Sequence, residues 1–333
     1  MRVLVTGGAG YIGAITAHKL LAAGCTVAVL DNLEKGYRAA VPPGVPFYQA
    51  DLRQPDSLAL PLREFRPEAV VHFAAYSLVG ESVQHPGRYF KNNVLGGLHL
   101  LEAMAALDCR RILFSSTAAV YGDPARIPVV EDDPTVPTNP YGDSKLAFEK
   151  ILTAFQRAYG FQAVSLRYFN AAGAWQDLGE DHRPETHLIP LVLEVALGRR
   201  EQLSIYGDDY DTPDGTAIRD YIHVSDLADA HVRAVEYLAK GQSPPSPLVN
   251  GGVFNLGNGA GYSVREVLET ARRVTGRAIP AVVAGRRPGD PPRLVAGSKR
   301  ARQVLGWKPR FPELEAMIAD AWAWKQAHPD GYA

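Results

Sequence analysis

The sequence contains very little cysteine. Among its 333 residues only Cys25 and Cys109 are cysteines, and two cannot form a disulfide framework; neither stands at a paired metal-ligand spacing. We interpret each as a small buried hydrophobic residue. A chain of this length can bury a sizeable core without covalent staples.

Long apolar runs and an excess of one charge are also lacking. The first apolar run covers residues 3–5, and no stretch approaches the roughly 20 apolar residues of a membrane span. The 35 Lys and Arg against 36 Asp and Glu give a net charge of −1, which leaves no electrostatic footprint for nucleic acid or an anionic membrane. We therefore expect a cytoplasmic protein with neither a nucleic-acid nor a membrane partner.

Metal-ligand patterns are the third absence. No cluster of histidine and acidic residues stands out at a metal-ligand spacing, so the sequence predicts no metal site. His72 in a strand pattern and His99 in a helical pattern are interpreted as structural residues.

The first half of the chain alternates short apolar runs with helical patterns. Strands are predicted at 3–5, 27–30, 69–73, 112–115 and 163–167, and helices at 14–23, 93–107 and 140–159. Strands that are apolar throughout and separated by helices are typical of a parallel sheet covered on both faces. The predicted fold is α/β: a Rossmann-type, doubly wound parallel sheet.

The residue composition and the predicted elements change after residue 170. Residues 171–187 are rich in Gly, Asp, His and Pro, 207–216 reads as a turn-rich loop, and 243–247 is a proline-rich connector. We expect a nucleotide-binding domain at 1–170, to which some later segments return. Residues 171–333 are expected to form a smaller, loop-rich α/β lobe that binds substrate.

A glycine-rich loop follows the first predicted strand and opens the first helix. Gly8, Gly10 and Gly13 fit G-x-G-x-x-G, and Gly7 can replace Gly8 in a G-x-x-G-x-x-G spacing. Glycine permits the tight turn and the close approach of backbone amides to a pyrophosphate. Asp31 ends the second strand, 18 residues beyond Gly13, where a carboxylate accepts from the ribose 2′-hydroxyl and repels a 2′-phosphate. The loop therefore predicts NAD in preference to NADP.

A second group of candidate residues combines a hydroxyl, a phenol and an amine. Thr117 follows an apolar strand at its carboxyl end, where α/β folds bind ligands. Tyr141 and Lys145, four residues apart on a helix that Asn139 can cap, lie on one helix face. An adjacent ammonium and a cationic nicotinamide ring would favour the phenolate, so we expect a lowered pKa for Tyr141.

With these motifs in place, the sequence resembles the extended short-chain dehydrogenase/reductase superfamily, and within it the UDP-glucose (UDP-galactose) 4-epimerases. The resemblance runs in order along nearly the whole chain. Beyond the residues above, it rests on the segments 31–33, 72–74, 79–82, 92–94, 115–122, 141–145, 167–170, 219–224 and 287–290.

The resemblance implies a reaction. Tyr141 would take the proton of the sugar 4-hydroxyl while C4 passes hydride to tightly bound NAD, Thr117 would hold O4, and Lys145 would bind the nicotinamide ribose. The 4-keto sugar would then turn over and recover the hydride on its other face, interconverting UDP-glucose and UDP-galactose.

The resemblance also implies the binding residues. Those expected at NAD are Gly7, Gly10, Tyr11, Ile12, Gly13, Asp31, Asn32, Asp51, Leu52, Phe73, Ala74, Asn92, Lys145 and Tyr168. Those expected at the UDP-sugar are Thr117, Tyr141, Asn170, Leu188, Tyr206, Arg219, Arg287, Asp290 and Leu294. Leu294 would border the sugar 2-substituent, so 2-acetamido sugars are expected to react slowly or not at all.

Some positions depart from the family pattern. Ser77 replaces a lysine of some members, and His187 replaces an asparagine beside the sugar nucleotide. A 4,6-dehydratase would need an acid and a base where Ala118 and Ala119 stand; a UDP-glucuronate-type epimerase and a silent NAD-sensing protein are further alternatives. The resemblance implies a homodimer, and the apolar faces of 93–107 and 144–159 suit either a dimer interface or the core.

Overall fold

The computed structural model describes residues 1–241, 252–287 and 289–332, and the predicted connector at 243–247 lies outside them. Seven strands form the large sheet: β1 (Arg2–Thr6), β2 (Thr26–Asp31), β3 (Phe47–Gln49), β4 (Ala69–His72), β5 (Arg111–Thr117), β6 (Gln162–Tyr168) and β11 (Val253–Leu256). The helices beside it are α1 (Tyr11–Ala22), α2 (Ala59–Phe65), α3 (Val79–Gln84), α4 (Pro86–Tyr89), α5 (Gly96–Ala106), α6 (Pro140–Tyr159), α8 (Val224–Ala239) and α10 (Lys299–Val304).

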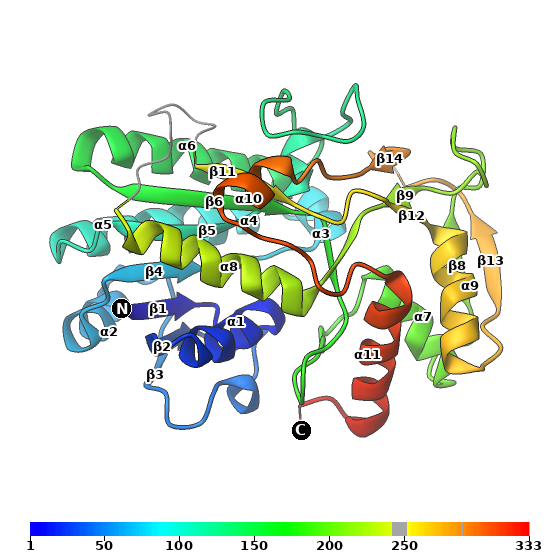
Figure 1. The fold of residues 1–333 in the computed structure, drawn as a ribbon, viewed down its shortest axis with the longest axis horizontal. Coiled ribbons are helices and arrows are strands. Elements are labelled where there is room, and N and C mark those ends of the chain that lie inside the picture. Colours follow the sequence, from blue (N-terminus) through cyan, green and yellow to red (C-terminus); the bar gives the residue numbers. More distant parts are fainter. Residues whose placement is uncertain (242–251, 288, 333) are drawn as a thin grey trace.

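The large sheet is parallel and covered on both faces, which confirms the predicted fold class. Its strand order is β11-β6-β5-β4-β1-β2-β3, and successive side chains of a strand point to opposite faces. Val3 and Val5 accordingly belong to the apolar cluster shared with α1 and α8. Leu4, between them, belongs to the cluster shared with α2, α5 and α6. Figure 1 shows α1 and α8 side by side on the near face of the sheet, with α5 and α6 beyond it.

The chain returns to this sheet after leaving it. β11 pairs in parallel with β6, Phe254 opposite Leu166, and α8 lies against α1 (Figure 1). The segments 224–239 and 253–256 therefore belong to the large layer, and no single break at residue 170 separates the two parts of the chain. Strands β3 and β11 were not among the predicted strands, because β3 is only three residues long and β11 lies within the loop-rich half.

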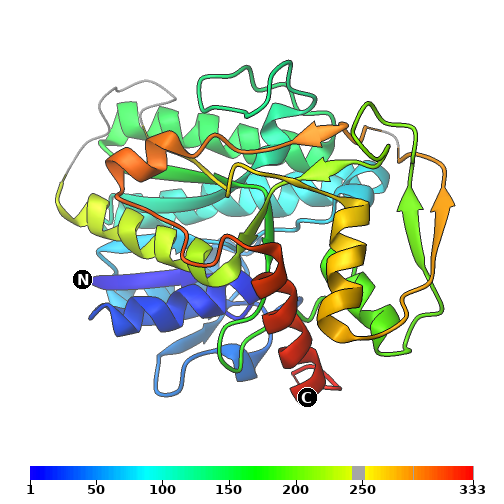
Figure 2. The same ribbon diagram turned by 45° about the vertical axis from the view of Figure 1, so that its right-hand side comes forward.

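A smaller lobe stands at the carboxyl-end side of the sheet (Figure 2). Its helices are α7 (Leu188–Ala196), α9 (Val264–Thr275) and α11 (Leu314–Ala327), which share an apolar core containing Val192, Val267 and Met317. Its strands are β7 (Asn170–Ala172), β8 (Leu203–Tyr206), β9 (Ile218–Arg219), β10 (Tyr221–His223), β12 (Tyr262–Ser263), β13 (Ala281–Ala284) and β14 (Arg293–Leu294). None of the described helices is long and apolar enough to cross a bilayer.

Candidate active site

The strand order places the candidate site at the carboxyl ends of β1, β4 and β5. The chain leaves β1 toward β2 on one side, and β4 lies on the other side of β1, so the switch in strand direction opens a crevice between the connections. Thr6, His72 and Thr117 are the last residues of these three strands. A ligand seated there would lie beside the glycine loop.

The backbone of the glycine loop leaves no room for side chains. Gly7 adopts φ +71°, and a Cβ there would lie 2.5 Å from the Ala74 nitrogen. A Cβ on Gly13 would lie 2.2 Å from the carbonyl oxygen of Gly7. Gly10 is the N-cap of α1, whose first turn carries no acidic residue. The amides and positive end of the helix dipole therefore remain available to a pyrophosphate, and the loop fits the phosphates of a dinucleotide.

Tyr11 and Ile12 follow the loop with their side chains turned inward. The Tyr11 hydroxyl donates to the Gly173 carbonyl at 2.6 Å, and burial raises the pKa of the Tyr11 phenol. Ile12 packs against two apolar clusters. Both residues can therefore reach a cofactor only through their backbone amides.

Asp31 ends β2 as predicted and is held by the loops around it. Its Oδ2 accepts from the Ala9 amide at 3.0 Å, and its Oδ1 accepts from the Leu33 amide at 2.8 Å. Only 7% of the residue is exposed, and this burial raises the pKa of its carboxyl group. The hydrogen bonds from these two backbone amides orient both carboxylate oxygens. Each oxygen keeps a lone pair that can accept from a ribose hydroxyl.

A cation that sequence reasoning missed lies near Asp31. Arg53 donates to Asp51 Oδ2 at 2.5 Å and to Glu34 Oε2 at 2.9 Å, and this guanidinium lowers the pKa of Asp51 to about 2. Asn32 also donates to Asp51, at 3.3 Å. Because two carboxylates hold Arg53, this guanidinium is already paired and is not a free cation for a 2′-phosphate.

The remaining residues expected at the cofactor lie on segments around the same crevice. The Phe73 and Ala74 amides both donate to the Thr6 carbonyl, at 2.9 and 3.1 Å. Leu52 is buried, and its carbonyl contacts His99 Nδ1 at 2.9 Å. Asn92 lies in the π-helical segment Phe90–Leu95, which replaces the start of the helix predicted at 93–107, and donates to Asn93 Oδ1 at 3.0 Å.

Thr117, Tyr141 and Lys145 come together as predicted. Asn139 caps α6, where its Oδ1 accepts from the Gly142 amide at 2.9 Å, and the helix sets Tyr141 beside the end of β5. The Thr117 side chain lies close enough to the Tyr141 phenol to influence its pKa. Lys145 Nζ lies 6.0 Å from the centre of the Tyr141 ring and donates to the Ser115 carbonyl at 2.8 Å.

Burial dominates the pKa shifts of this group in the protein without its cofactor. Burial raises the pKa of Tyr141, although the nearby Thr117 side chain lowers it in part. Burial also lowers the pKa of Lys145 to about 7. The expected fall in the Tyr141 pKa depends on the cationic nicotinamide ring as well as on Lys145, so it stays a prediction for the enzyme with NAD bound. Tyr168, whose hydroxyl bonds to the Ser115 hydroxyl, also has a raised pKa because it is buried.

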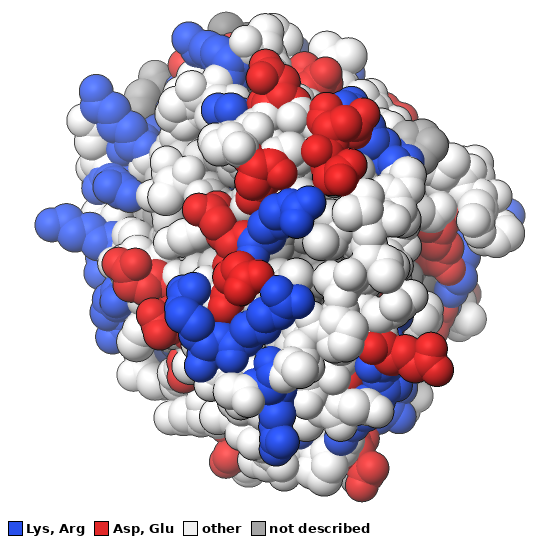
Figure 3. Space-filling view, turned by 90° about the vertical axis from the view of Figure 1, so that its right-hand side faces the viewer, with Lys and Arg blue, Asp and Glu red and all other residues white. Residues whose placement is uncertain are grey.

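The residues expected at the UDP-sugar form two groups on the smaller lobe. Arg219 donates to Asp290 Oδ1 at 3.1 Å, and its backbone lies opposite Leu294 in the pairing of β9 with β14. Arg287 places its guanidinium 3.9 Å from the centre of the Tyr206 ring. On the face of this lobe in Figure 3, cationic and anionic side chains are interspersed.

Other contacts relate these groups to the catalytic end of the sheet. Leu294 packs against the apolar cluster that contains Val120 and Leu146, close in sequence to Thr117 and Lys145. Asn170 donates to the Asp220 carbonyl at 2.9 Å, and Leu188 is the first residue of α7. These contacts bring Leu294 toward the catalytic end of the sheet, and binding of the UDP-sugar by the whole set stays a prediction.

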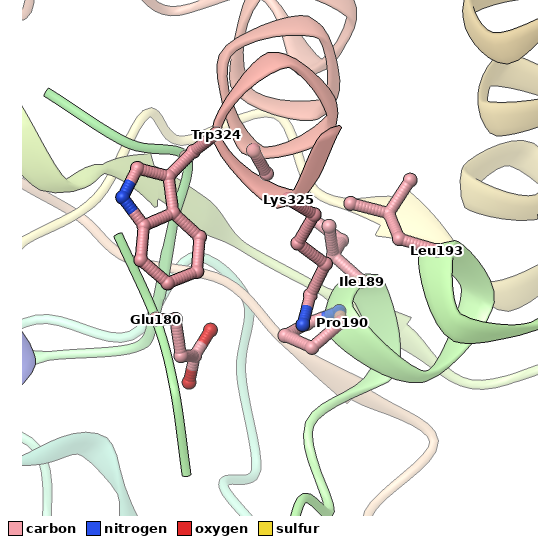
Figure 4. Close-up of a pocket in the computed structure, with 8 residues that line it drawn as sticks. Glu180, Ile189, Pro190, Leu193, Trp324 and Lys325 are labelled. Atoms are coloured by element: carbon pink, nitrogen blue, oxygen red, sulfur yellow. The ribbon is translucent and has the colours of Figure 1, made fainter. Parts of the chain in front are cut away.

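The structure also contradicts the absence of a metal-ligand cluster. Glu180, His182, Glu185 and His187 place one ligand atom each within 4.8 Å of one another. The signal was present in the sequence as E-x-H-x-x-E-x-H, but it fell in a segment interpreted only as turn-rich. Figure 4 shows Glu180 on the segment before α7, near Trp324 and Lys325 of α11, which line a small pocket with it.

The sheet, the glycine loop and the Thr-Tyr-Lys group define a nucleotide-dependent enzyme of the Rossmann class. The chain belongs to the NAD dependent epimerase/dehydratase family, which it matches over residues 3–257.

Relatives of known activity are similar over the full length. The chain is 55% identical over 336 residues to a UDP-glucose 4-epimerase of Halalkalibacterium halodurans, covering 100% of this chain and 98% of the relative. A crystal structure of a UDP-glucose 4-epimerase superposes with a TM-score of 0.95 at 48% identity over 100% of both chains. The Bifidobacterium longum enzyme, solved with NAD⁺ and UDP, gives 0.93 at 39% identity over 99% of this chain and 100% of that one. These matches confirm the resemblance drawn from the motifs.

Proposed function

We propose that this chain interconverts UDP-glucose and UDP-galactose by inverting C4 of the hexose through a 4-keto intermediate. The observation that carries the proposal is the meeting of Thr117, Tyr141 and Lys145 at the carboxyl end of β5, beside the glycine loop. The full-length similarity to UDP-glucose 4-epimerases supports the same activity.

NAD fits the crevice because the tight turn, which excludes a Cβ at Gly7 and Gly13, presents the amides that open α1. Its amides would hold the pyrophosphate, Asp31 the adenine ribose, and Lys145 the nicotinamide ribose. When bound, NAD supplies the acceptor and donor of the hydride at C4. Since the reaction has no net redox change, one bound cofactor serves every turnover.

The chain's own residues would carry out the proton transfer. Tyr141 as phenolate removes the proton of the 4-hydroxyl and later returns it, while Thr117 hydrogen-bonds O4 and keeps the oxygen in line with the phenol. The positive nicotinamide ring and the Lys145 ammonium together favour the phenolate once the cofactor is bound. The pyrophosphate of UDP would lie on Arg219 and Arg287, since guanidinium binds phosphate oxygens in a bidentate manner.

The test is a cofactor-free assay on purified protein without a tag. UDP-galactose is added with no NAD, and formation of UDP-glucose is followed by chromatography. We expect turnover, with mainly NAD released when the protein is denatured in acid. Absence of interconversion, or release of mainly NADP, would contradict the proposal. UDP-glucuronate is run in parallel, because its epimerisation would favour the alternative substrate class.

We further infer that the enzyme acts as a homodimer in the cytoplasm. The exposed apolar residues Phe90 and Leu95 precede α5, one of the two helices that would form the contact. A cytoplasmic location is supported by the ligands themselves, a nicotinamide cofactor and nucleotide sugars.

A further inference from the structure

Four side chains before α7, Glu180, His182, Glu185 and His187, converge on one point. None of them moves a proton or hydride in the proposed reaction, although His187 stands at a position expected beside the sugar nucleotide. The Nδ1 atoms of His182 and His187 lie 3.0 and 2.9 Å from Glu180 Oε1. His187 Nδ1 lies 2.8 Å from Glu185 Oε1, and His182 Nδ1 lies 4.0 Å from Glu185 Oε2. Two imidazole nitrogens and two carboxylates therefore alternate around a small space.

These separations match the edges of a tetrahedral metal site. Zn²⁺ binds histidine nitrogen and carboxylate oxygen at about 2.0–2.2 Å, so its ligand atoms stand about 3.4 Å apart in a tetrahedron. The observed separations of 2.8–4.0 Å lie on both sides of that value. Small side-chain rotations would suffice to equalise them.

One ligand atom in this cluster accepts no hydrogen bond. The Oε1 atom of Glu185 accepts from the amides of Thr186 and His187, at 2.7 and 2.8 Å. Its Oε2 atom is buried and has no hydrogen-bond partner. A buried carboxylate oxygen left unsatisfied is costly, and the amides fix the carboxylate so that Oε2 stays within the cluster. A cation at the centre would satisfy it.

The cluster is also closed on one side and accessible on the other. The side chains of Glu180 and Glu185 are 9% and 12% exposed, and those of His182 and His187 are 27% and 41% exposed. The carboxylates thus form the floor and the imidazoles the rim, which gives an ion a route of entry.

We propose that Glu180, His182, Glu185 and His187 bind one Zn²⁺ ion as a structural site. Two imidazole ligands favour zinc over Mg²⁺ and Ca²⁺, which prefer oxygen ligands in larger numbers. The ion would stiffen a segment that touches the glycine loop through the Tyr11–Gly173 hydrogen bond and ends at Leu188 of α7. The site would thus stabilise a segment that connects the glycine loop with the smaller lobe. The zinc proposal does not depend on the reaction proposed above.

The test measures metal directly. Full-length protein without a tag is stripped with a chelator, dialysed against Zn²⁺, Mg²⁺ or Co²⁺, and analysed by mass spectrometry for bound metal. We expect one equivalent of Zn²⁺, no retained Mg²⁺, and the strong visible absorption of tetrahedral Co²⁺. Zn²⁺ should also raise the Tm of the protein, since a ligand of the native state stabilises it by mass action.

Matched variants assign the ligands. His182→Ala and Glu185→Gln should each weaken zinc binding at least tenfold, since even outer-shell substitutions cost about 10–100-fold. His182→Cys keeps a zinc ligand and should retain the ion. His85→Ala and Glu201→Gln change exposed residues elsewhere and should bind zinc as the unchanged protein does.

Two results would overturn the proposal: unchanged protein that holds no more zinc than the double variant His182→Ala/Glu185→Gln, or Co²⁺ that gives only the weak spectrum of an octahedral ion. The Co²⁺ spectrum is recorded on the unchanged protein. The proposal can therefore be contradicted even if the variants fail to fold. Loss of epimerase activity with full zinc binding would count against the proposed function alone.

Discussion

Tyr141 is the residue on which the proposed chemistry depends most directly. Tyr141→Phe keeps the ring and removes the hydroxyl, so UDP-sugar binding should persist while proton transfer is lost. We expect kcat to fall by about 10²–10⁴, the usual scale of general acid–base catalysis. The measurement is kcat for UDP-galactose together with Kd for UDP-glucose by calorimetry.

Thr117 provides the matched comparison. Thr117→Ser keeps the hydroxyl beside Tyr141 and should be mild, whereas Thr117→Val keeps the shape and should slow the same step. Tyr141→Phe with near-normal turnover would refute the assigned base.

Lys145 predicts a pH effect on the stability of the cofactor-free protein. Burial lowers its pKa from 10.5 to about 7 in the folded state. Between these values the folded protein holds the neutral amine while the unfolded chain still binds the proton. Stability from this residue therefore rises with pH over that window, by at most about 1.4 kcal/mol per pH unit. In urea unfolding at pH 7, 8 and 9, the free energy of unfolding of wild type should rise with pH relative to that of Lys145→Met.

The control for this effect lies on the same helix. Lys150 is exposed on α6, and Lys150→Met should differ from wild type by the same amount at each pH. A Lys145→Met difference that is equally flat would show that the folded protein does not exclude the charged amine.

Leu294 remains the predicted gate for the sugar 2-substituent. It lies on β14 opposite Arg219 and packs near Val120 and Leu146, on the side of the crevice that faces the catalytic group. Leu294→Ser should raise the kcat/KM ratio of UDP-N-acetylglucosamine to UDP-glucose, and Leu294→Tyr should abolish any acetamido activity. A methylene-scale change in such a pocket is worth about 1–3 kcal/mol. A ratio that stays the same in all three proteins would remove Leu294 from this role.

At the scale of elements, helix α6 carries a buried ion pair beneath the catalytic residues. Glu149 Oε2 accepts from Arg167 Nη2 at 2.6 Å and Glu149 Oε1 accepts from Ser116 at 2.6 Å. The side chains of Glu149 and Arg167 are 3% and 1% exposed. Glu149→Gln should lower the free energy of unfolding by about 3–5 kcal/mol, because it leaves a buried guanidinium without its counter-charge.

A surface ion pair is the comparison for this prediction. Arg126 pairs with Asp133 at 2.6 Å, but its side chain is 63% exposed. Arg126→Ala should change the free energy of unfolding by less than about 1 kcal/mol. Urea unfolding of both variants measures the contrast, and equal losses would show that burial does not set the strength of the α6 pair.

Elements with a strong local signal could be predicted from the sequence. Helix α6 was expected at 140–159 and is found at Pro140–Tyr159, because Asn139 and Pro140 mark its start and Gly160 its end. The five predicted strands all lie in the large sheet. The Thr117–Tyr141 contact followed from placing a helix start beside a strand end.

What the sequence did not indicate depends on tertiary contacts. The π-helical turn at Phe90–Leu95 has the apolar pattern of an ordinary helix. The raised pKa of Tyr141 comes from burial that no spacing reveals. The Arg167–Glu149 pair joins a strand and a helix 18 positions apart.

At the scale of the whole molecule, the chain crosses between its two layers several times. It leaves the large sheet after β6, returns through α8 and β11, and leaves again toward α9 (Figure 2). The two sides of the crevice are thereby tied by several connections. Such a topology suits a reaction in which the sugar must turn over while both nucleotides stay in place, because the walls that hold the nucleotides cannot easily separate.

The last prediction concerns assembly. Leu95 is 44% exposed just before α5, on the surface that α5 and α6 would bury in a dimer. Sedimentation equilibrium should give twice the chain mass of 36.1 kDa, and Leu95→Glu should shift the population toward single chains, because a carboxylate buried at an apolar contact is costly. Val283→Glu is the matched control: Val283 is 51% exposed on β13 of the smaller lobe, and this variant should sediment as wild type. A Leu95→Glu protein that keeps the full dimer mass would place the interface elsewhere, and single chains in wild type at micromolar concentration would contradict the dimer itself.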